Sequence, residues 1–154
     1  MRVLWITNIL FPDICNKLGI QPPVTGGWMQ SLISAIKEYS PNVQFGIAAL
    51  YGTGKELIER EINGITYFCL PFNPYNTKYN SKEEIVWKDV HNRFKPDLIH
   101  IHGTEFPHGL AYIKANGGEN VIASIQGLRK GIAPFALAGI PIPVLKNMLA
   151  YTIG

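Results

Sequence analysis

Side chains that can move protons or hold ligands are concentrated in one short stretch of the sequence. They are His100, His102, Glu105 and His108. Imidazole and carboxylate groups at this spacing suit either a metal site or a polar contact with a bound ligand. The sequence has no second cluster of metal-ligating residues. We therefore expect no metal and interpret the stretch as one border of a ligand site.

The strand that carries these side chains predicts where they lie. Apolar residues dominate 98–101 and predict a short buried strand, which Gly103 ends. His100 and His102 are two positions apart and share one face if the strand extends that far. Ligands of open α/β sheets bind at the carboxyl ends of the strands. We therefore expect His102, Gly103 and Glu105 at a binding site, and His100, deeper in the strand, in a structural hydrogen bond.

Two further loops, Gly26-Gly27 and Gln126-Gly127, are expected at the same border. Gly26 and Gly27 precede a helix, where free backbone amides attract phosphate or carboxylate groups. Gln126 ends a strand, and its amide can donate to and accept from a hydroxyl-rich ligand. A plain turn and a solvated strand end remain the alternatives. The chain has neither a G-x-G-x-x-G pattern nor a P-loop lysine, so standard dinucleotide and triphosphate sites are not supported.

Continuous apolar runs, typical of strands buried on both faces, predict the strands of a sheet. They cover 3–7, 43–50, 98–101 and 121–125. Asn63-Gly64 separates two strand-like runs over 60–62 and 65–70, a pattern that predicts a hairpin.

Helical spacing of apolar residues predicts helices between the strands. They run over about 28–39, 81–94 and 107–115, and from Pro143 onward. Ser81 and Glu84 have the spacing of a capping box at the start of the second helix. Residues 8–27 contain three prolines and are expected to form a long loop.

Alternating strands and helices predict the fold class α/β, with a Rossmann-like, doubly wound, mostly parallel sheet covered by helices on both faces. We expect strand 3–7 at the centre and strand 98–101 beside it. Right-handed crossovers then bring the loops after strands 3–7, 98–101 and 121–125 to one edge of the sheet.

Composition limits the function classes. The chain has 154 residues, with 47% hydrophobic and 16% charged residues, which fits one folded domain and excludes a disordered chain. The net charge of +3 comes from scattered basic residues, so we expect no nucleic-acid partner. The two cysteines form no motif, and no apolar run is long enough to span a membrane. We expect a cytoplasmic protein and leave open a peripheral contact with the inner face of the membrane.

The end of the sequence suggests a missing partner. The helix expected after Pro143 has an apolar face that no other predicted element covers, and it reaches Gly154 without a clear cap. We expect a second domain to cover it.

Taken together, these segments resemble the N-terminal domain of family 4 glycosyltransferases. They are Val3-Leu-Trp-Ile-Thr7, Thr25-Gly-Gly-Trp28, Pro96-Asp-Leu-Ile-His-Ile-His-Gly103 and Val121-Ile-Ala-Ser-Ile-Gln-Gly127. The resemblance implies one half of a GT-B fold, with residues 1–154 on the acceptor side and the donor-binding C-terminal domain, which carries a paired-glutamate motif, absent. It further implies transfer of a sugar with retention, usually without a metal, and we expect no cofactor.

The resemblance also implies partners and roles. The partners would be a nucleotide-sugar donor and a sugar or lipid-linked acceptor, in the synthesis of polysaccharide or glycoconjugate. Gly26 and Gly27 would approach the donor diphosphate or the acceptor, and His102 with the loop to Glu105 would border the acceptor pocket. Many members have a histidine where this chain has Gln126. Glutamine cannot act as a general acid or base, so a hydrogen bond to a sugar hydroxyl is the role left for it.

Other classes remain open beside the transferase. A non-catalytic α/β domain that binds a small ligand fits the same pattern. A small hydrolase is disfavoured because the chain has no G-x-S-x-G elbow. A response-regulator-like domain would need acidic residues after the first strand, where Asp13 stands alone.

Overall fold

The computed structural model describes residues 1–24, 26–52, 54–125 and 144. The chain divides into two compact units, Met1–Ser124 and Ile125–Gly154. Every helix and strand with defined bounds lies in the first unit. None of the helices in the described part of the chain is long and apolar enough to cross a membrane.

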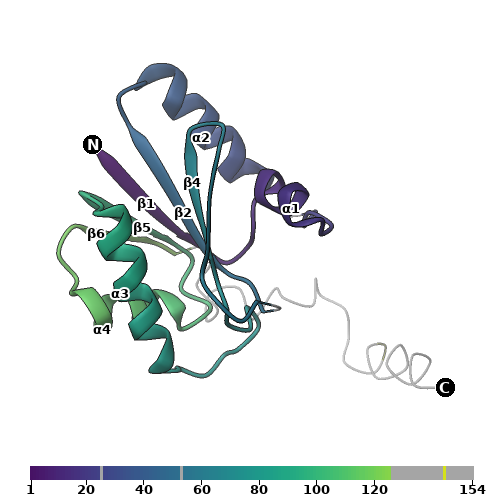
Figure 1. Cartoon of the computed structure of the whole chain (residues 1–154), viewed down its shortest axis with the longest axis vertical. Helices are drawn as coiled ribbons and strands as arrows, with labels where there is room; N and C mark the ends of the chain where they lie inside the picture. Colours follow the sequence, from purple (N-terminus) through teal and green to yellow (C-terminus); the bar gives the residue numbers. More distant parts are fainter. Residues whose placement is uncertain (25, 53, 126–143, 145–154) are drawn as a thin grey trace. The chain divides into compact units, whose positions relative to one another are not determined.

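The first unit is built on a mostly parallel sheet in the order β3-β4-β2-β1-β5-β6 (Figure 1). Its strands are β1 (Arg2–Thr7), β2 (Gln44–Leu50), β3 (Ile58–Ile62), β4 (Ile65–Leu70), β5 (Leu98–His102) and β6 (Val121–Ser124). Only β3, which pairs with β4, runs antiparallel within this sheet. The prediction that β1 lies centrally with β5 beside it is confirmed, and β5 extends as far as His102.

The hairpin prediction is also confirmed. Asn63 and Gly64 connect β3 and β4, and both have positive φ, 53° and 71°. This is the backbone conformation that Asn-Gly accepts at low cost and that matches the twist of two paired strands.

Helices cover both faces of the sheet, as the alternating pattern predicted (Figure 1). The helices α1 (Pro12–Leu18) and α2 (Gly27–Tyr39) pack on one face, and α3 (Lys82–Phe94) and α4 (His108–Asn116) pack on the other. Side chains alternate along each strand, so β1 sends Leu4 to the core under α3 and α4, and Trp5 to the core under α1 and α2. Two apolar cores therefore hold one sheet between them.

The strand order creates a switch point between β1 and β5. After β1 the chain builds the sheet outward through β2 and β4, and it then crosses back to add β5 on the other side of β1. The loops that leave β1 and β5 consequently turn away from each other, which opens a crevice at their carboxyl ends. This is the edge where the sequence predicted a ligand site.

The long loop expected over residues 8–27 is wrong in part, because α1 forms inside it. Pro12 occupies the first turn, where a missing N–H costs nothing, and Gly19 ends the helix at a φ of 69°. Ile14 and Cys15 are buried and anchor the helix to the sheet. A helix of seven residues has too short an apolar pattern to be recognised from the sequence, and the nearby prolines indicate a loop instead.

Two further expectations are corrected by the structure. The strand over 121–125 was expected to be buried, but β6 ends at Ser124, forms the edge of the described sheet and leaves Ile122 52% exposed. The capping box at Ser81 does not form: Ser81 has helical backbone angles and makes no side-chain cap. The Glu84 carboxylate instead accepts a hydrogen bond from the Tyr79 hydroxyl.

Candidate functional site

Three polar side chains meet where β1 and β5 end. Asn8, directly after β1, donates from Nδ2 to the Glu105 carboxylate at 3.0 Å. Its Oδ1 lies 2.8 Å from Nε2 of His108, at the start of α4. We call these residues the Asn8 network. Because Asn8 presents its oxygen to His108, the Nε2 of that ring must carry the proton.

The structure keeps His108 neutral. The side chain is 3% exposed, and its ring stacks on Phe106 with the centroids 5.8 Å apart. Burial lowers the pKa of His108 to about 4, although the nearby Glu105 carboxylate acts in the opposite direction. The Nδ1 atom has no hydrogen-bond partner among the described residues. A neutral ring that donates through Nε2 therefore fixes the Asn8 amide, which in turn orients Glu105.

Gly103 gives this network its space. Its φ is 89°, a conformation that side chains rarely adopt. A Cβ at this position would collide with the Glu105 carboxylate and would lie 2.7 Å from Nδ2 of Asn8. The glycine after β5, which the sequence predicted at the binding site, is therefore required for the hydrogen bond between Asn8 and Glu105.

His102 lies inside the protein rather than on an open rim. It is 1% exposed, and its ring centroid is 4.3 Å from that of Trp5, 3.8 Å from that of His100 and 5.6 Å from that of Trp28. Neither ring nitrogen has a hydrogen-bond partner among the described residues. Burial, together with the neighbouring His100, lowers the pKa of His102 to about 4. His102 is therefore buried at the strand end, and the contact with a ligand that the sequence predicted for it stays a prediction.

His100 shares the face of His102, as the spacing predicted. Its Nε2 lies 2.6 Å from the Ser124 hydroxyl of β6. Burial lowers the pKa of His100. The hydrogen bond joins β5 to β6, which agrees with the structural role expected of this residue.

Gly26 and Gly27 begin α2 at the same edge of the sheet. Gly26 has a φ of 89°, and no side chain caps the helix. The Ile9 side chain, just after β1, fills the space that a Cβ of Gly26 would need. Trp28, in the first turn, reaches the buried ring of His102. The backbone amides at the start of α2 are thus held close to the ends of β1 and β5.

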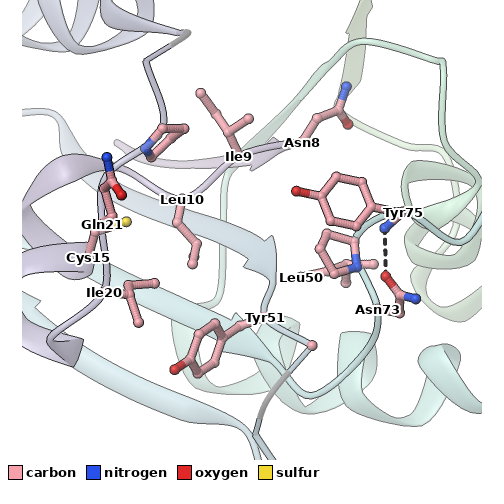
Figure 2. Close-up of a pocket in the computed structure, with 13 residues that line it drawn as sticks. Asn8, Ile9, Leu10, Cys15, Ile20, Gln21, Leu50, Tyr51, Asn73 and Tyr75 are labelled. Atoms are coloured by element: carbon pink, nitrogen blue, oxygen red, sulfur yellow. Dashed lines mark hydrogen bonds between the residues drawn. The ribbon is translucent and has the colours of Figure 1, made fainter. Parts of the chain in front are cut away.

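A hollow of about 590 Å³ lies over the ends of β1, β2 and β4 (Figure 2). We call it the large hollow. Its lining comes from the turn after β1, from α1 and the segment after it, and from the loops after β2 and β4. The residues are Asn8, Ile9, Leu10, Cys15, Ile20, Gln21, Pro23, Leu50, Tyr51, Gly52, Asn73, Pro74 and Tyr75. Its volume is typical of a small-molecule site.

A second hollow of about 380 Å³ borders the Asn8 network at Glu105. Gly103 and Glu105 line it, together with Thr77 from the loop after β4 and residues of α4. Asn8 lines the large hollow and Glu105 lines the second, so the hydrogen bond between them joins the walls of the two. Of the predicted site residues, Gly103 and Glu105 border a cavity, and Gly26 and Gly27 line only a small recess of about 80 Å³.

Sequence reasoning missed several residues of this edge. Asn8 was predicted only as the first residue of the long loop over 8–27, although a polar residue directly after a central strand is a signal for the switch point. Tyr51, directly after β2, was missed as well, whereas Asn73 belongs to the Asn-, Pro- and Tyr-rich tract over 67–79, for which the sequence left open a loop over the site or a plain surface loop. The predicted contacts Gln126 and Gly127 lie outside the described residues. Within the part of the chain that the structure describes, no group of three or more His, Cys, Asp or Glu side chains could hold a metal ion.

Comparison with known proteins finds only distant structural similarity. No protein-family model matches the chain, and no curated protein matches it. Two solved structures are similar at 14% identity. One, described as "Trehalose-6-phosphate from E. coli bound with UDP-2-fluoro glucose", has a TM-score of 0.48 over 81% of this chain. The other, "OtsA apo structure", has a TM-score of 0.46 over 80%. The chain spans 33% of the length of each. Likenesses this distant carry no information about activity, so the function is argued below from the residues themselves.

Proposed function

We propose that residues 1–154 form the acceptor-side, N-terminal domain of a family 4 glycosyltransferase with the GT-B fold. The complete enzyme would transfer a sugar from a nucleotide-sugar to a sugar or lipid-linked acceptor, with retention of configuration. We place this reaction in the cytoplasm, in the synthesis of polysaccharide or glycoconjugate, with peripheral membrane contact left as part of the proposal.

One observation carries the proposal. The segments that resemble the family in sequence are separated along the chain, yet they converge in space. The end of β1, the start of α2 and the end of β5 meet at the switch point of the sheet. The contacts that join them are Gly26 with Ile9 and Trp28 with His102. If these segments resembled the family only because they share its core packing, we would not expect them to meet at the edge where α/β sheets bind ligands.

The polar groups at this edge are suited to binding a ligand and orienting it. The amides that begin α2 offer N–H groups to an anionic group such as a donor phosphate. The Asn8 network holds one carboxylate, Glu105, in a fixed position. The buried rings of His102 and His108 are neutral, so neither adds positive charge near neutral pH. In the proposal this domain positions the acceptor, and the domain that binds the nucleotide-sugar supplies most of the stabilisation of the transition state.

A non-catalytic binding domain is the second candidate, and one observation favours it. No acidic, basic or histidine side chain is found among the described residues that line the large hollow. Its described lining thus offers binding groups, but no carboxylate, imidazole or amine to act as general acid or base. The two candidates differ in whether a sugar is transferred.

The test is nucleotide release by the protein in its full natural length, measured over a panel of UDP-, GDP- and ADP-sugars with and without added acceptors. We expect release from one donor class that increases with acceptor, and no turnover by residues 1–154 alone, because the transition state must be held from both domains. Release by residues 1–154 at the full-length rate would contradict the half-enzyme proposal. Failure of the full-length protein to release nucleotide from any donor would favour the binding domain.

A further inference from the structure

We propose that the large hollow binds an uncharged, hydroxyl-rich ligand that carries an apolar portion, of the class of a neutral glycoside. In the proposed function this ligand is the acceptor, and its role as acceptor rests on that proposal. Its chemistry rests on the lining residues alone. The inference therefore narrows the acceptor to uncharged molecules and disfavours phosphorylated or carboxylated sugars.

The charge of the hollow is the first argument. The described lining contains no Lys, Arg or His that could pair with an anion, and no Asp or Glu that could pair with a cation. The Cys15 thiol stays protonated because burial raises its pKa. An ionised ligand would lose hydration here without gaining a partner. The Glu105 carboxylate accepts a hydrogen bond from Asn8 of the wall at 3.0 Å, and its negative charge would repel an anion further.

The polar groups of the hollow are the second argument. Gln21 and Asn73 contribute amides, and Tyr51 and Tyr75 contribute phenol hydroxyls (Figure 2). Amides and hydroxyls donate and accept hydrogen bonds without carrying charge, which matches the hydroxyl groups of a sugar. The Oδ1 of Asn73 already accepts the backbone N–H of Tyr75 at 2.9 Å. This bond fixes the loop after β4 and leaves the Asn73 amide nitrogen available to a ligand.

The apolar part of the lining is the third argument. Ile9, Leu10, Ile20 and Leu50 lie between the polar groups, from three separate segments of the chain (Figure 2). Removing these apolar side chains from water would favour binding. A ligand that is hydroxylated throughout would leave these side chains without a complementary surface. We therefore expect tighter binding when the sugar carries an aglycone.

A matched pair of probes tests the inference by isothermal titration calorimetry on the full chain. The probes are p-nitrophenyl β-D-glucopyranoside and p-nitrophenyl β-D-glucuronide, which share an aglycone and differ in a carboxylate. Glucose 6-phosphate is the third probe. We expect the neutral glycoside to bind at least about tenfold more tightly than either anion. Equal or tighter binding of an anion, or no detectable binding of the glycoside at millimolar concentration, overturns the inference.

Two lysine variants show whether the absence of charge in the hollow decides the selectivity for the neutral glycoside over the glucuronide. Gln21 is exposed at the border of the hollow, so Gln21→Lys should fold normally and place a cation there. We expect this variant to bind the glucuronide more tightly and to lose most of the discrimination. Asn16→Lys, an exposed amide of α1 that does not line the hollow, is the control and should keep the selectivity of the parent chain. Unchanged selectivity in Gln21→Lys, or the same change in Asn16→Lys, contradicts the assignment to this hollow.

The results also separate this inference from the proposed function. Selective binding of the neutral glycoside without nucleotide release by the full-length protein would leave the inference standing and remove the transferase. Nucleotide release that depends on anionic acceptors alone would leave the transferase standing and remove the inference.

Discussion

The large hollow and the Asn8 network lie next to each other and share Asn8, yet they are built by opposite means. The hollow has volume, exposed amides and hydroxyls, and no charged side chain in its described lining. The network has a carboxylate and a histidine fixed by hydrogen bonds, with the histidine almost fully buried. In our proposal the two regions have different roles: the hollow accommodates the ligand, and the network holds polar groups at a fixed place beside it.

The largest expected effect is on the pH dependence of stability. The Asn8 network contains a buried histidine, whereas the described lining of the hollow contains none. His102 and His108 have pKa values of about 4 in the folded chain, against the ordinary value of 6.5. Between these values the unfolded chain binds more protons, so the free energy of unfolding rises with pH and is lost as pH falls from about 6.5 towards 4. A shift of this size corresponds to about 3 kcal/mol for each ring.

Denaturant unfolding at neutral pH and near pH 4 measures this loss. His108→Gln should show a smaller loss than the parent chain, because one of the histidines with a lowered pKa is then removed. A free energy of unfolding that does not change over this pH range would contradict the buried, neutral state of both rings.

The next effect concerns the glycine that makes room for the network. Gly103→Ala should destabilise the fold by about 2–4 kcal/mol, because it combines backbone strain with a collision against Asn8 and Glu105. Gly117 has the same φ of 89° and no heavy atom near its would-be Cβ. Gly117→Ala therefore reports strain alone and should cost less. Thermal unfolding of both variants measures the difference, and equal costs would show that crowding at Gly103 is absent.

A pair of asparagine variants compares the two regions directly. Asn8→Ala leaves the buried Nε2–H of His108 without an acceptor, which should cost about 1–3 kcal/mol. Asn73 is exposed, and Asn73→Ala removes only a local turn hydrogen bond, so it should cost about 0.5 kcal/mol. Urea unfolding of the two variants measures both values. If Asn73→Ala lowered the free energy of unfolding more than Asn8→Ala does, the network would not be the more rigidly held of the two regions.

A further small effect is expected at His102. Its two ring nitrogens have no partner among the described residues, so His102→Leu removes buried polar atoms and should change the free energy of unfolding by less than about 1.5 kcal/mol. His108→Leu should cost more, because Asn8 then loses its donor. If His102→Leu instead destabilises strongly or abolishes ligand binding, His102 has a partner or a ligand contact that the packing does not reveal.

The sequence was sufficient for the centre of the fold. Continuous apolar runs predicted β1, β2 and β5, because a strand that is buried on both faces needs apolar residues at nearly every position. The Asn63-Gly64 turn predicted the hairpin because its positive φ angles restrict the residue types. The edge strand β6 was predicted as buried, because an apolar run does not reveal whether a neighbouring strand covers it.

The site was predictable only in outline. The edge of the sheet followed from topology, and Gly103 and Glu105 followed from their position after β5. The hydrogen bonds from Asn8 to Glu105 and His108 join residues 97 and 100 positions apart, and no local pattern indicates such a pairing. The burial of His102 depends on Trp5 and Trp28, which also come from distant segments.

The most direct test of the central claim, that the carboxyl edge of the sheet beside β1 holds the ligand, is a map of amide chemical-shift changes on titration. We would titrate the full chain, ¹⁵N-labelled, with p-nitrophenyl β-D-glucopyranoside. The account predicts changes concentrated at Asn8–Leu10, Ile20–Gln21 and Tyr51–Gly52, and in the loop at Asn73–Tyr75. Changes confined to the opposite edge, at Gln44 where β2 begins or at the Asn63-Gly64 turn, would contradict it.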